Sequence, residues 1–126
     1  MIKETDVLKS AIEYLQAKLP GIRIVPFSQQ FEEPGFPTVA VNVHSRSSQL
    51  SIHGEELALV TISVSVYADN LYDTAQKNGV MGIYDKIIEA FVERGYQRVN
   101  QTEPYYTSSY RKWCKDGNFN KKTNVF

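Results

Sequence analysis

The sequence has one cysteine and no run of about 18 apolar residues, the length that a membrane-spanning helix requires. The single thiol, Cys114, has no partner in the chain for a disulfide bond, and no residues with metal-ligand spacing surround it. Residues 1–4 lead directly into an amphipathic pattern rather than into the apolar core of a signal peptide. We therefore expect a cytoplasmic protein with no membrane partner, in which Cys114 is a buried or half-buried spectator.

Motifs for catalysis are also missing. The sequence contains no glycine-rich phosphate loop and no serine or cysteine in a nucleophile motif. Two adjacent glutamate pairs, at 32–33 and 55–56, point to opposite faces of an extended chain and therefore do not share a proton. His44 and His53 are the candidate base or ligand pair, but neither has a Cys, His or carboxylate at the spacing of a metal site. We expect no enzyme, no cofactor and no metal.

Charge of one sign is missing too, because 14 basic residues balance 14 acidic ones. A neutral chain does not find nucleic acid or an anionic membrane through its overall field. The distribution is uneven, however: residues 1–93 carry seven Lys or Arg against twelve Asp or Glu, whereas residues 94–126 carry seven against two. One interpretation is that neighbouring copies meet head to tail, acidic surface against basic surface. The alternative is that both sets are solvated faces.

The clearest pattern that is present lies in residues 38–44 and 57–67. In both segments apolar side chains recur at every second position, which is the period of a half-buried strand. The apolar positions are Val39, Val41 and Val43 in the first segment and Ala58, Val60, Ile62, Val64 and Val66 in the second. Together they predict a long hairpin with one face in the core.

Helical spacing appears on both sides of this hairpin. Apolar residues at three- and four-residue intervals predict a first helix that Thr5 or Asp6 caps and that the Pro20-Gly21 pair stops. A second stripe predicts a helix from Asp69 or Asn70 to about Arg94.

Two glycines weaken the middle of the second predicted helix. Gly79 and Gly82 each cost roughly 1 kcal/mol relative to alanine inside a helix. Either close backbone packing or a local break near residues 78–79 would account for them.

The remaining segments predict further strands, at 21–27, 96–100 and 104–115, and the Asp116-Gly117 pair predicts a tight hairpin turn. The sequence thus predicts one domain over residues 1–126. Its fold class is α+β, with a mainly antiparallel sheet of four to five strands that includes the long hairpin and is covered by two helices.

Between the hairpin strands, residues 45–54 form a segment that is too long for a tight turn and too polar for the core. We interpret it as a projecting loop, an arm of the kind that is often mobile in the free protein and ordered when a partner binds. The candidate interface residues are Arg46, Ser47, Ser48, Gln49, Leu50, Ser51, Ile52 and His53.

Aromatic and basic residues interleave near the C-terminus. They are Tyr105, Tyr106, Tyr110, Arg111, Lys112, Trp113, Lys115, Lys121 and Lys122. This composition suits base stacking and phosphate contacts. It equally suits an edge strand whose lysines discourage aggregation, or a protein interface with Tyr, Trp and Arg anchors.

In element order and in one short motif, the chain resembles the tail terminator proteins of long-tailed bacteriophages, also called tail completion or minor tail proteins. The motif is FPTVAVNV at residues 36–43, similar to a Phe-Pro-x-Val-x-Val entry into the first long strand. The likeness continues through ALVTISVSVY at residues 58–67 and into the helix that contains Ile87, Ile88 and Phe91.

This resemblance implies a structural virion protein that forms a ring, a hexamer in that family, at the head-proximal end of the tail. Such a ring stops polymerisation of the tail tube protein and joins the tail to the head–tail connector or stopper protein. The subunits assemble in the host cytoplasm, and DNA passes through the ring without being specifically bound.

Three other functions stay open at this stage. A head–tail stopper or adaptor belongs to the same phage neck. A small α+β enzyme or ligand-binding domain would gather His44 or His53 with carboxylates in a deep pocket. A nucleic-acid-binding module would show salt-dependent affinity through the basic C-terminal segment.

Overall fold

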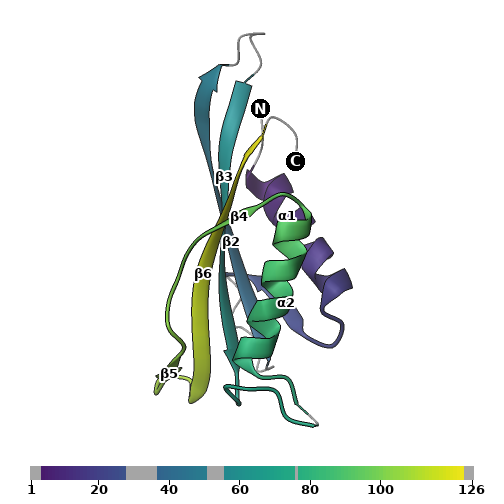
Figure 1. The fold of residues 1–126 in the computed structure, drawn as a ribbon, viewed down its shortest axis with the longest axis vertical. Coiled ribbons are helices and arrows are strands. Elements are labelled where there is room, and N and C mark those ends of the chain that lie inside the picture. The colour runs from purple at the N-terminus through teal and green to yellow at the C-terminus, as the bar shows by residue number, and fades with distance from the viewer. Residues whose placement is uncertain (1–3, 28–36, 51–55, 76, 124–126) are drawn as a thin grey trace.

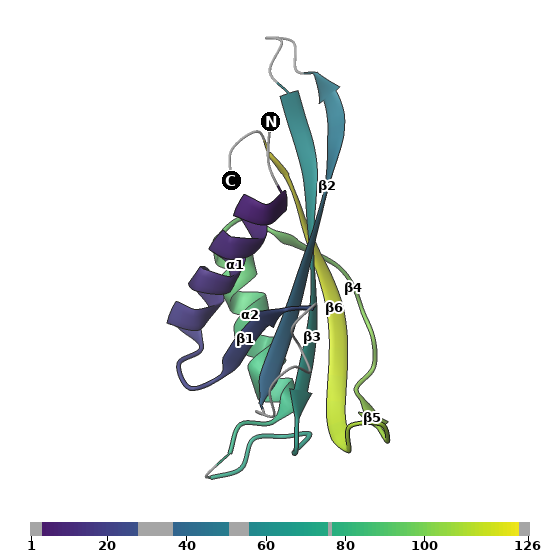
Figure 2. The same cartoon turned by 180° about the vertical axis from the view of Figure 1, so that it is seen from behind.

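The computed structural model describes residues 4–27, 37–50, 56–75 and 77–123. Both helices lie on one face of a single elongated sheet, and the other face carries no helix within these ranges (Figures 1 and 2). The predicted α+β class with two covering helices is confirmed. In chain order the elements are α1 (Glu4–Lys18), β1 (Arg23–Pro26), β2 (Thr38–Leu50), β3 (Glu56–Ala68), α2 (Val80–Glu93), β4 (Gln97–Gln101), β5 (Tyr105–Thr107) and β6 (Lys112–Thr123).

The strands follow the spatial order β1-β2-β3-β6-β4, and β5 pairs separately with β6. All pairs are antiparallel except β1 with β2. The described residues form six strands rather than the predicted four to five, because the segment predicted as one strand at 104–115 contains a turn between β5 and β6.

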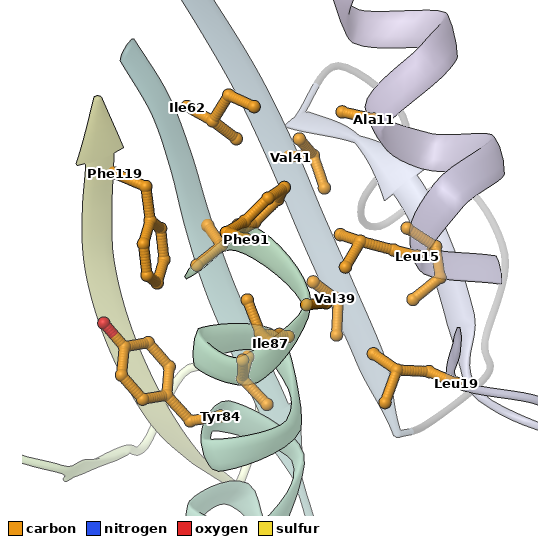
Figure 3. Packing of buried hydrophobic residues seen from close by; sticks show 14 of the residues in the cluster. Ala11, Leu15, Leu19, Val39, Val41, Ile62, Tyr84, Ile87, Phe91 and Phe119 are labelled. Carbon is orange, nitrogen blue, oxygen red and sulfur yellow. The ribbon is translucent and has the colours of Figure 1, made fainter. Parts of the chain in front are cut away.

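The core lies between the sheet and the helices (Figure 3). Period-two alternation in β3 puts Val60, Ile62, Val64 and Val66 under the helices, each with at most 1% of its surface exposed. Phe119 on β6 lies in the same layer and packs against Phe91 of α2 with ring centroids 5.0 Å apart. Burial of each such side chain contributes about 1.5–3 kcal/mol.

The helices bury single apolar stripes. On α1 the stripe consists of Val7, Ala11 and Leu15, spaced four residues apart, and it packs over β1 and β2. This helix begins at Glu4, not at a cap on Thr5 or Asp6, so the predicted start is wrong by a residue or two. Its predicted stop is confirmed, because the helix ends at Lys18.

The predicted start of the second helix is wrong. Residues 69–75 and 77–79 lie in a loop, and α2 begins at Val80. The loop folds back over the first turn of the helix: the Gly79 amide donates to Asp73 Oδ1 over 2.6 Å, and the Val80 amide donates to a loop carbonyl. Both predicted reasons for the glycines are confirmed. Gly79 lies at the break before the helix, and Gly82 packs closely, because a Cβ there would collide with the Asp73 carboxylate.

The predicted Asp116-Gly117 turn is also wrong. Both residues lie inside β6, paired with Ser65 and Val64 of β3. Gly117 is required there for a different reason, because a Cβ at this position would overlap the Tyr84 hydroxyl. The chain reverses instead between β5 and β6, where Arg111 has a φ of 55°, a conformation that costs a non-glycine residue energy.

Candidate interaction surfaces

The predicted projecting loop is in large part a continuation of the hairpin. Strand β2 runs on to Leu50 and pairs with β3 as far as Leu50 opposite Glu56, with an irregularity between Ser47 and Leu50. The strands extend beyond the helices at one end of the molecule (Figure 1). The prediction of a loop from residue 45 is therefore wrong, whereas the prediction of a projection at this place is confirmed.

The candidate interface residues divide between strand and undescribed chain. Five of them, Arg46, Ser47, Ser48, Gln49 and Leu50, belong to β2. The other three, Ser51, Ile52 and His53, lie outside the described residues. We call residues 45–50 of β2 with their β3 partners the arm.

His44, one of the predicted base or ligand pair, is an exposed residue of β2. Its predicted partner His53 lies outside the described residues, as do both glutamates at 32–33 and one of those at 55–56. Across the ranges that the structure describes, no three His, Cys, Asp or Glu side chains gather as a metal site would require. His44 therefore belongs to no group of metal-binding type within these ranges.

A hollow of about 550 Å³ lies on the sheet face that carries no helix. Its floor includes a polar ladder across three strands: the Ser63 hydroxyl donates to Asn118 Oδ1 over 2.6 Å, and Asn118 Nδ2 donates to Asn100 Oδ1 over 2.6 Å. Because these groups bond to one another, a ligand in the hollow would have to break the ladder or leave it unused. The ladder is better explained as a connection that holds β4 to β6 and β3.

Cys114 lies beside the same hollow and is buried, as predicted. Its Sγ is 3.3 Å from the Tyr105 hydroxyl and 3.6 Å from Asp116 Oδ1, and Tyr105 itself donates to Asp116 over 2.8 Å. Burial raises the pKa of the thiol to about 11, and the nearby Asp116 carboxylate adds to the rise. At neutral pH the sulfur therefore keeps its proton and is a poor nucleophile.

The basic aromatic segment does not form one face. Lys115 is 4% exposed, donates to the Thr102 carbonyl over 2.7 Å and lies over the Tyr84 ring on the helix-covered side. Lys112 forms a salt bridge of 2.6 Å with Asp69. Since two of its cations are already used inside the molecule, this segment fits nucleic-acid binding less well than the sequence suggested.

Strand β5, which carries Tyr105 and Tyr106, lies at the end of the molecule opposite the arm (Figures 1 and 2). Tyr106 packs edge-on against Trp113 with ring centroids 5.7 Å apart, and Tyr110 packs likewise against Tyr67 at 6.4 Å. Tyr106 and Tyr110 remain 53% and 43% exposed, so this end presents aromatic surface of the kind that protein interfaces use.

The sequence patterns did not predict which strand edges of the sheet are left without a described neighbouring strand. We call these edges the open margins. Beyond its short pairing with β1, the β2 strand has no described neighbour on one side, and β4 has none on the side away from β6. Strand order decides which edges are open, and no local pattern in a single sequence encodes it. Both edges are five residues or longer.

No described helix is both long enough and apolar enough to cross a membrane. No protein-family model matches the chain, and no curated protein is significantly similar to it.

Proposed function

We propose that this chain is a structural subunit of a bacteriophage tail, which assembles into a ring at the head-proximal end of the tail tube. The ring stops polymerisation of the tube protein and presents its other side to the head–tail connector or stopper. Six copies per ring is the number that the resemblance to tail terminators implies. The protein acts by contact and not by chemistry.

The observation that carries this proposal is the arm. The two paired strands extend past the helices, and residues 45–49 of β2 are all polar, so the arm contributes little to the stability of an isolated subunit. A projection of this kind suits a contact with another protein. The aromatic surface around β5, at the opposite end of the molecule, supplies a second contact, and a protein that joins two structures needs two.

The candidate chemical groups in the described ranges do not favour an enzyme. Cys114 is buried and protonated, His44 belongs to no described metal-type group, and Ser63, Asn118 and Asn100 on the floor of the hollow bond to one another. None of these features favours an enzyme. We expect DNA to pass the ring without specific binding, because two of the basic side chains near the C-terminus bond within the subunit.

Electron microscopy of the purified protein with assembled tail tubes from the encoding virus tests the proposal. We expect a ring at one end of each tube, and light scattering of the protein alone gives its mass before assembly. A stopper or adaptor would leave bare tubes untouched and bind the connector instead. Protein that ignores both the tubes and the connector would overturn the proposal.

The arm permits a sharper version of the experiment. Arg46 pairs with Leu59 across the hairpin, so replacing residues 47–58 with Asn-Gly joins the two strands by a short turn in register. We expect this variant to keep its circular dichroism spectrum and to lose tube binding. The matched control, Ser109→Ala in the exposed turn at the other end, should keep both. Rings formed by the shortened variant would exclude a role for the arm.

A further inference from the structure

We propose that neighbouring copies of this chain join edge to edge, with the open margin of β2 in one copy paired to the open margin of β4 in the next. The sheet then continues from subunit to subunit. This inference rests on the proposed ring and names the contact that builds it.

The first open margin begins where β1 stops. Strand β1 pairs with residues 38–41 of β2, and its last partner pair is Pro26 with Val41. Pro26 has no amide hydrogen, so it is a natural end for a ladder. Residues 42–50 of β2 therefore have β3 on one side and no described strand on the other.

This margin lacks most of the devices that protect edge strands. Exposed edges usually carry proline, lysine or an early bulge, which discourage pairing with other chains. Residues 42–50 contain neither proline nor lysine, and Arg46 is their one charged residue. The pairing with β3 is regular from Asn42 to Ser47 and becomes irregular only between Ser47 and Leu50. A regular edge over residues 42–47 is a template for a strand from a partner.

The second open margin is at the opposite side of the same sheet. Strand β4 pairs with β6 on one side only, and all five of its residues are exposed, including the apolar Val99 at 51%. A copy whose β2 margin meets the β4 margin of a neighbour leaves its own β4 margin free for a third copy. Such heterologous contacts close into rings or continue as filaments.

The charge asymmetry of the chain suits this head-to-tail pairing. Residues 1–93, which include β2, carry seven Lys or Arg against twelve Asp or Glu, whereas residues 94–126, which include β4 and β6, carry seven against two. In or beside β4 lie the basic residues Arg94, Arg98, Lys121 and Lys122. A contact between the β2 margin of one copy and the β4 margin of the next brings the acidic part of one chain against the basic part of another.

Cysteine cross-linking tests the pairing. In a Cys114→Ala background, we would place one cysteine in β2, at Asn42, His44 or Arg46, which share one face of the strand. A second cysteine would replace Gln97 or Asn100 of β4, whose β6 partners Asn120 and Asn118 lie on the face without helices. Chains with one substitution each are mixed and treated with a short bis-maleimide. The matched control is Ser109→Cys in the exposed turn between β5 and β6.

We expect a mixture of β2 and β4 variants to give covalent dimers, while each variant alone gives none. A chain that carries both cysteines should give a ladder of dimers, trimers and larger products, because a heterologous contact propagates. Dimers from a β2 variant alone, or a doubly substituted chain that stops at dimers, would mean a symmetric contact and overturn the proposal. The Ser109→Cys control should not cross-link.

The experiment separates this inference from the proposed function. Rings on tail tubes without β2–β4 cross-links would leave the ring standing and overturn the edge pairing. A β2–β4 ladder from concentrated protein that ignores both tubes and connector would support the edge pairing and overturn the tail function. No ladder and no rings would overturn both. As a second measurement, hydrogen exchange should slow in residues 42–47 and 97–101 on assembly, with β5 unchanged.

Discussion

The two faces of the paired strands β3 and β6 have opposite character. On one face Ile62 and Phe119 lie opposite each other on the side that α2 covers, and both are completely buried. On the other face Ser63 and Asn118 sit opposite each other in a hydrogen-bonded ladder beside an open hollow. The same strands thus hold the core on one side and a polar, partly solvated surface on the other. Because successive side chains of a strand point to opposite faces, neighbouring residues serve the core and the surface in turn.

The largest effect that would test this contrast is expected from Phe119→Ala. Phe119 is fully buried and packs against Phe91 and Tyr84, with ring centroids 5.0 and 6.3 Å away (Figure 3). Its truncation should lower the free energy of unfolding by about 3–5 kcal/mol. Urea unfolding followed by circular dichroism gives the value.

The control for this variant is Asn120→Ala, the next residue of β6 that points to the other face. It should change the unfolding free energy by less than about 0.5 kcal/mol. Equal losses from the two variants would mean that both faces carry the core, contrary to the comparison.

A smaller loss is expected from Gly117→Ala. This glycine lies on the helix-covered side of β6, where an added methyl would overlap the Tyr84 hydroxyl. Overpacking of this kind costs typically about 1–3 kcal/mol. Combining the change with Tyr84→Phe removes the nearest atom and should recover part of the loss, which a double-mutant cycle measures. Strictly additive losses would show that the overlap is not the cause.

The sequence was informative where one face is apolar and the other polar. The strand predicted at residues 57–67 corresponds to β3, Glu56–Ala68, because burial on one side leaves a period-two signal in the sequence. The arm has no such signal: residues 45–49 are polar on both faces. Their strand conformation comes from pairing with β3, a distant part of the chain, and so a loop was predicted instead.

Tertiary contacts overrode local preference at Asp116-Gly117. The pair has the composition of a tight turn, yet β6 passes straight through it because β3 pairs along its whole length there and the Tyr84 hydroxyl needs the space. The candidate interaction surfaces also depend in part on tertiary structure. The position of the projection was readable from the polarity of residues 45–54, whereas the open margins of β2 and β4 depend on strand order, which only the folded chain defines.

Alkaline pH should lower the free energy of unfolding through the buried Cys114 thiol, which lies on the face without helices. Burial holds the pKa of Cys114 at about 11 against an ordinary value of 9.0, so the folded state keeps a proton that the unfolded state loses. The stability that depends on this protonated thiol is complete below pH 9 and disappears as the pH rises through about 11. Burial of Tyr96, whose pKa rises from 10.0 to about 12, extends the decline on the helix side.

Urea midpoints measured from pH 7 to 11 check this expectation. In Cys114→Ala the fall between pH 9 and 11 should be shallower than in the unchanged protein, and at pH 7 the unchanged thiol should resist alkylation until the protein unfolds. An identical pH profile in both proteins would mean that the thiol is solvated in the folded state.

The smallest effect concerns the polar ladder. Asn118 accepts from Ser63 and donates to Asn100, so Asn118→Ala removes two hydrogen bonds on the partly solvated face. Because water replaces the lost partners there, we expect a loss of about 1 kcal/mol, well below that of Phe119→Ala one position along the strand. Ser63→Ala removes one bond of the two and should cost less. Urea unfolding of both variants measures the difference. If Asn118→Ala lowered the free energy of unfolding as much as Phe119→Ala, water would not reach the ladder in the folded protein. The face without helices would then be a second buried core and not a surface for a partner.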